Sequence, residues 1–303
     1  MHLNQRPLFI FPSLAAERAC VDIKRRKTPQ AMERVLWAKG LKEVLGVDRA
    51  IVVTSDNRHE TRDFGAAHGV GILQGQFLQR VITAFAPGNR LTEEELFSLL
   101  RSPCVVDSSV DWPVWFRRVK ARLLDGLNFD GCNSFLMAAK LLLDEYVATG
   151  RSSEISVRLL YAVIAYLLVC LDYASRSCIS LDVAGRTSVL TDGFRYGEAG
   201  RQRTEEIVQM ALQLLSDAGK TGLFSGETLR EEFDRQVSEY RAEILGEHFA
   251  KTEALKNLFT AARSFDELAY AKTLPRPNEV PSEQKSIIGL LCDLLQHDRK
   301  GII

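Results

Sequence analysis

The sequence predicts two parts, an α/β domain over residues 1–86 followed by an all-α domain over residues 90–303. Short apolar runs alternate with amphipathic segments in the first part, whereas the second has helical periodicity almost exclusively. Between them, the segment Ala86-Pro87-Gly88-Asn89-Arg90 is rich in helix and strand breakers. The charge changes as well: residues 1–86 carry 13 basic and 8 acidic side chains, and the remainder carries 26 and 31.

The composition is that of a globular protein. Apolar residues make up 46% and charged residues 26% of 303 positions, which excludes collagen-like, low-complexity and wholly disordered chains. The net charge is zero, yet the first part is basic, and this suggests a module that faces phosphate groups.

No segment predicts a membrane span or a secretory signal. The longest uncharged apolar run, Leu159–Leu171, is shorter than the roughly 20 residues that cross a bilayer, so we expect a buried helix. The apolar start is interrupted by Pro12 and soon followed by charges, unlike a signal peptide. The six cysteines form no CxxC pair, so we expect reduced thiols, no zinc site and a cytoplasmic protein.

The first part predicts the order β–β–α–β–α–β–α. An apolar run at Leu8–Phe11 and the segment Arg18–Lys24 are the first two expected strands. Thr28 and Pro29 are typical of a helix start and Gly46 of a helix end. The remaining expected elements are a central strand at 50–54, a helix at 60–68, a strand at 70–73 and a helix at 75–85.

In the second part, Thr92 and Glu95 form a capping-box pattern before an apolar run. Buried helices are expected at 133–149 and 156–175. The Gly- and Arg-rich stretch 181–203 is expected to be an exposed loop. Further helices are expected at 205–218, as one long helix through 229–258, and from Ser282 onward.

The most informative residues for chemistry are Asp22 and Lys24. On a strand they share a face because side chains alternate. A carboxylate beside a lysine can hold a divalent metal while the ammonium stabilises phosphoryl charge or orients water. Two other acid-x-Lys triplets occur, at 283–285 and 298–300, but only Asp22-Ile23-Lys24 ends a strand and precedes a basic cluster.

The order of elements over residues 8–85 resembles the later part of a PD-(D/E)xK nuclease domain of the restriction-endonuclease-like, Mrr-type group. The resemblance covers about a quarter of the chain. It rests on Asp22-Ile23-Lys24, the helix from Pro29, and the strand and turn Ile51-Val52-Val53-Thr54-Ser55. The segments that follow, Arg62–Gly69 and Val70–Gly75, also match the pattern.

The resemblance implies a metal-dependent DNA endonuclease in restriction, phage defence or repair. Asp22 would bind Mg²⁺ or Mn²⁺ through its carboxylate and Ile23 through its backbone carbonyl, and Lys24 would be the catalytic lysine. Metal-activated water would then attack a phosphodiester, with Lys24 stabilising the developing charge.

One departure from the family pattern stands out, because the family needs another metal-binding Asp about one hairpin upstream. Residues 1–21 contain no Asp, and Glu17 points to the opposite face of a regular strand. Two hypotheses follow. Either Met1 is an internal start and the missing carboxylate lies upstream, or the domain is degenerate and binds DNA without cutting it.

Alternative interpretations remain for these residues. Asp22 and Lys24 could form a solvated ion pair, worth about 0–1 kcal/mol. Arg25, Arg26 and Lys27 are either DNA-binding residues or a solvated edge. The helical part is acidic and thus a poor DNA binder, so the alternative function is a non-enzymatic one. Residues 90–303 would then bind a protein partner or a second copy of the chain.

Overall fold

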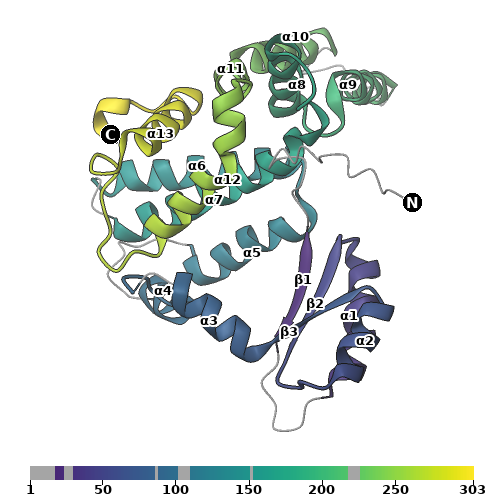
Figure 1. Ribbon diagram of the computed structural model, residues 1–303. Coiled ribbons are helices and arrows are strands. Elements are labelled where there is room, and N and C mark those ends of the chain that lie inside the picture. Colours follow the sequence, from purple (N-terminus) through teal and green to yellow (C-terminus); the bar gives the residue numbers. More distant parts are fainter. Residues whose placement is uncertain (1–17, 24–29, 86–87, 102–109, 151–152, 218–225) are drawn as a thin grey trace. The chain divides into compact units, whose positions relative to one another are not determined.

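The computed structural model describes residues 18–23, 30–85, 88–101, 110–150, 153–217 and 226–303 (Figure 1). The chain separates into two compact units, with a division between Arg90 and Leu91. A small hydrophobic core lies in the α/β unit and a large one in the helical unit.

The α/β unit is built on a three-stranded parallel sheet. Its strands β1 (Ala19–Ile23), β2 (Arg49–Thr54) and β3 (Val70–Gln74) lie in the order β1-β2-β3. Parallel neighbours need crossover connections, and α1 (Ala31–Leu45) and α2 (His59–Ala67) supply them. Both helices lie on one face of the sheet (Figure 1), as two crossovers of the same hand require. Helix α3 (Gly75–Phe85) follows β3 directly.

The two faces of this sheet differ. Toward α1, Ala50 and Val52 of β2 and Val70 of β3 pack against Val35 and Ala38 of the helix. The alternate side chains of β1 point the other way, and those of Val21 and Ile23 remain exposed. Because Cys20 and Asp22 occupy the intervening positions, Asp22 is directed toward α1.

The expected elements of the α/β part are confirmed wherever the structure describes them. The strand expected at 18–24 is present as β1 over Ala19–Ile23, and the central strand, the two later helices and the last strand appear as β2, α2, α3 and β3. Gly46 ends α1 in the left-handed conformation, with φ of 59°. The expected strand at 8–11 and the helix start at Thr28 and Pro29 lie outside the described residues.

The helical unit surrounds one central helix, α7 (Glu154–Ala174), which packs against α6 (Phe129–Ala148) and α12 (Thr252–Ala269). Thr92 and Glu95 form the expected capping box at the start of α4. The other helices are α4 (Glu93–Leu100), α5 (Trp112–Asp125), α8 (Val183–Tyr196), α9 (Gly200–Asp217), α10 (Gly226–Glu239), α11 (Glu243–Phe249) and α13 (Ser282–Leu294).

Helix α7 is long and apolar enough to cross a membrane by length and composition alone. Within the described residues, 89% of its most apolar window is buried by the protein itself. This burial is that of a core helix, as the sequence predicted.

The prediction of an exposed loop at 181–203 is wrong, because α8 and the start of α9 occupy this stretch. Asp182 caps α8 by accepting a hydrogen bond from the backbone N–H of Gly185. Arg186 is buried and donates to the backbone carbonyls of Ala250 and Leu181. This arginine therefore holds α8 in the core of the helical unit. The composition of the stretch did not reveal this role.

The prediction of one long helix over 229–258 is also wrong, because three helices, α10, α11 and α12, cover it. Helix α11 turns to pack against α8. There, a Cβ atom at Gly246 would lie only 2.1 Å from Oγ1 of Thr191. Periodicity continues across both breaks because each helix buries one face, so the apolar pattern did not reveal the change of direction.

Candidate functional site

The carboxyl ends of the three strands lie at one edge of the sheet, because the strands are parallel. Asp22 and Ile23 end β1, Thr54 ends β2, and Gln74 ends β3. In open α/β sheets, ligands bind just beyond this edge. Asp22, the candidate metal ligand, thus lies where a functional residue is expected.

Asp22 is bound by an arginine of α1. Nε of Arg34 lies 2.6 Å from Oδ2 of Asp22, and Nη2 donates to its backbone carbonyl oxygen at 2.9 Å. Both side chains are about nine-tenths buried, with 12% of Asp22 and 10% of Arg34 exposed. The guanidinium thus holds the carboxylate and the strand backbone together.

This arrangement pairs Asp22 with a cation, which opposes metal binding at this carboxylate. The Arg34 guanidinium occupies one carboxylate oxygen of Asp22, and its positive charge repels a second cation nearby. Among the described residues, no group of three or more His, Cys, Asp or Glu side chains could hold a metal ion. Of the predicted site, Ile23 ends β1 with an exposed side chain, while Lys24, Arg25, Arg26 and Lys27 lie outside the described residues.

A second carboxylate, Asp56, follows the end of β2. It lies in a tight turn whose backbone N–H at Asp56 donates to Oγ1 of Thr54. The carboxylate accepts hydrogen bonds from the backbone N–H and the guanidinium of Arg58, and from the hydroxyl of Thr61 at 2.9 Å. Asp56 therefore organises the turn that leads into α2.

These contacts favour the ionised form of Asp56. Hydrogen bonds from the Arg58 side chain and backbone, and from Thr61, hold the pKa of this carboxyl well below its usual value, although burial opposes the shift. Asp56 is thus a structural anion at neutral pH, and it is neutralised by Arg58.

The sequence interpretation missed Arg34, Asp56, Arg58 and Thr61. A local signal exists for Asp56 and Arg58. Asp56 stands two residues before Arg58 and three before the first residue of a helix, a spacing typical of a carboxylate that binds backbone N–H groups in a turn. Arg34 has no local signal, because it is 12 residues from Asp22 and meets it only once α1 packs on the sheet.

Comparison of the chain with protein-family models, curated proteins and solved structures finds no match. The interpretation of this edge therefore rests on the chemistry of its own side chains.

Proposed function

We propose that the α/β unit binds DNA at the carboxyl edge of its sheet, as a degenerate relative of the nuclease domain that it resembles. The observation that supports binding without cleavage is the pair between Asp22 and Arg34. In a metal-dependent nuclease this carboxylate holds the metal. Here it holds α1 to β1.

The balance of charge at this edge favours an anionic ligand. Arg34 neutralises Asp22, and Arg58 neutralises Asp56. Directly after β1, the sequence continues through four successive cations, Lys24 to Lys27. Since the two carboxylates are already paired, these four charges add to a positive potential rather than cancel a negative one. A positive potential beside a parallel sheet suits the phosphates of DNA.

The binding experiment measures the affinity of the full chain for duplex DNA over a range of salt concentrations. Replacing Arg25, Arg26 and Lys27 together by Ala should weaken binding and reduce the salt slope by about 0.9 for each phosphate that is no longer neutralised. The control replaces three exposed arginines of the helical unit, Arg201, Arg203 and Arg263. Equal reductions of affinity in the two triple variants, or no salt-dependent binding, would contradict the proposal.

A cleavage assay separates the degenerate relative from an active nuclease. Supercoiled plasmid is incubated with the full chain and Mg²⁺ or Mn²⁺, and we expect it to remain intact. Nicking that requires the divalent ion and disappears in both Asp22→Ala and Lys24→Ala would replace our proposal with the nuclease hypothesis. That outcome would also require Arg34 to release Asp22 and a further carboxylate to complete the site.

A further inference from the structure

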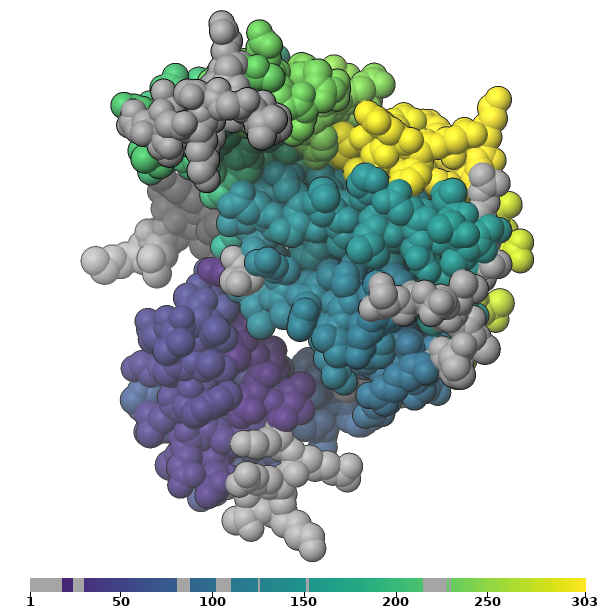
Figure 2. Space-filling model, turned by 180° about the vertical axis from the view of Figure 1, so that it is seen from behind, coloured from purple at the N-terminus to yellow at the C-terminus, as the bar shows by residue number. Residues whose placement is uncertain are grey.

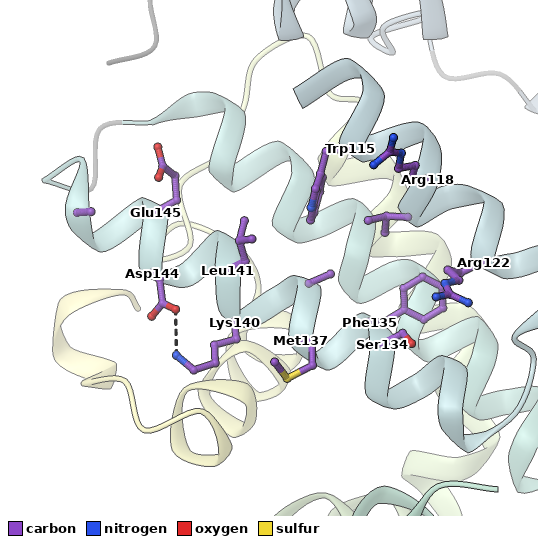
Figure 3. A pocket seen from close by; sticks show the side chains of 13 residues that line it. Trp115, Arg118, Arg122, Ser134, Phe135, Met137, Lys140, Leu141, Asp144 and Glu145 are labelled. Atoms are coloured by element: carbon purple, nitrogen blue, oxygen red, sulfur yellow. Dashed lines mark hydrogen bonds and ion pairs between the residues drawn. The ribbon is translucent and has the colours of Figure 1, made fainter. Parts of the chain in front are cut away.

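An open groove of about 900 Å³ runs between α5 and α6 in the helical unit (Figure 3). Its apolar lining includes Trp115 and Val119 of α5 and Met137 and Leu141 of α6. The space-filling view shows the teal region that includes these helices as part of the outer surface (Figure 2). Every residue that lines the groove belongs to the helical unit.

Helix α6 has one buried apolar side, and on its groove side apolar residues lie exposed among polar ones. Its inner side buries Phe135, Leu142 and Leu143 in the core of the unit. Its groove side exposes 66% of Met137 and 38% of Leu141. Large apolar side chains that gather in a groove beside polar ones are typical of a surface that binds another molecule.

The α5 wall of this groove is positively charged. Arg118 and Arg122 lie one helical turn apart on it, and both are exposed (Figure 3). Among the described residues, no ion pair joins either guanidinium to a carboxylate, whereas Arg201 and Arg263 on other helices are paired with Glu residues four positions later. On the α6 wall, Lys140 binds Asp144 at 2.9 Å, and Glu145 is a further carboxylate of the lining, so cations outnumber carboxylates in the groove.

We propose that this groove binds an acidic amphipathic helix of a partner protein. The apolar side chains of that helix would cover Met137, Leu141 and Trp115. Two of its carboxylates, one turn apart, would pair with Arg118 and Arg122, because residues at i and i+4 repeat at the same spacing on any α-helix. A long apolar groove with charges along one wall is the usual receptor for such a helix. Charge complementarity therefore identifies the occupant.

Two synthetic helical peptides test this proposal against the full chain. They share one length and one leucine face, and the residues flanking that face are Glu in one peptide and Lys in the other. Fluorescence anisotropy at fixed salt should show the Glu peptide binding at least about tenfold more tightly than the Lys peptide. The double variant Arg118→Glu/Arg122→Glu should reverse this preference.

Two further variants test whether the peptides occupy the groove itself. Met137→Glu should weaken binding of the Glu peptide, because it places a charge on the apolar floor. Arg201→Glu/Arg203→Glu, an equal reversal of charge on α9, should leave the preference unchanged. Circular dichroism of each variant verifies that the helices have formed.

Several outcomes would overturn the proposal. One is that neither peptide binds. Another is that both bind equally, or that the Arg118→Glu/Arg122→Glu variant keeps the original preference. Loss of duplex DNA binding in that variant without any effect on peptides would assign these arginines to nucleic acid instead. A dimer of the chain that Met137→Glu dissociates, with no peptide binding, would assign the groove to a second copy.

Discussion

The Arg34 guanidinium binds Asp22 twice, with Nε 2.6 Å from a carboxylate oxygen and Nη2 2.9 Å from the backbone carbonyl oxygen. The pair joins the first helix of the α/β unit to the end of its first strand. It also occupies the carboxylate that, in a nuclease of the family the sequence resembles, would face a metal ion. One ion pair thus bears on both the stability and the chemistry of this unit.

Replacing Arg34 by Leu should destabilise the protein by about 3 kcal/mol, because Asp22 is left as an unpaired charge that is largely buried. The double variant Asp22→Leu/Arg34→Leu should recover part of this stability, since no isolated charge remains. Urea unfolding followed by circular dichroism measures both values. Arg62→Leu, an exposed change on α2, is the control. Equal destabilisation in the single and double variants would contradict the prediction that an unpaired Asp22 charge causes the loss.

The contribution of Asp56 to stability should depend on pH. Its pKa is lower in the folded chain than in the unfolded one, so the stabilisation is complete above the unfolded value of about 3.9. It is lost as the pH falls below that value toward the folded pKa. Asp56→Asn should therefore be less stable than the parent at about pH 7, by roughly 1–3 kcal/mol.

The two proteins should approach each other in stability at about pH 3, where the unfolded carboxyl is mostly protonated. Urea midpoints at the two pH values measure the difference. Asp63→Asn, the same substitution at an exposed position of α2, is the control. A gap that stays constant with pH would contradict the role assigned to Arg58 and Thr61.

Arg158 should be among the most sensitive positions of the helical unit. Its guanidinium is 2% exposed and donates to the carbonyl oxygens of Ala269 and Ala271, at the end of α12 and just beyond it. Arg158→Met should cost about 3 kcal/mol or more, because buried carbonyls are left without donors. Glu154→Gln, which alters only its exposed partner, should cost less than about 1 kcal/mol. Thermal unfolding measures the stability of both variants. Similar destabilisation by both would contradict the role of Arg158 as donor to the buried carbonyl oxygens.

Replacement of two helical glycines by alanine should change the stability of the protein in opposite directions. A Cβ at Gly193 of α8 would lie 2.4 Å from the Phe129 ring, so Gly193→Ala should cost about 1–3 kcal/mol. At Gly40 of α1 no atom lies within 4 Å, so Gly40→Ala should stabilise by up to about 1 kcal/mol through helix propensity. The urea midpoints of the two variants measure both changes in stability. If Gly193→Ala were stabilising, α6 and α8 would be less closely packed than described.

Much of the local structure could be predicted from the sequence. The capping box of Thr92 and Glu95, the helix end at Gly46 and the apolar strand at 50–54 depend on neighbouring residues, which short patterns record. The stretch at 181–203 could not be predicted in this way. Gly193 and Arg186 are typical of a loop, yet they serve contacts with Phe129 and Ala250, which lie more than 60 residues away in the chain.

The sequence by itself determined the order of the elements from β1 to α3, the change from an α/β part to a helical part, and the position of Asp22 at the end of a strand. Only the tertiary structure decided that Asp22 is paired with Arg34, that Asp56 organises a turn, and that α5 and α6 form a groove. The physical reason is the distance along the chain over which each interaction acts. Periodicity and capping act within a few residues, whereas ion pairs, buried arginines and grooves arise where packing brings distant helices and strands together.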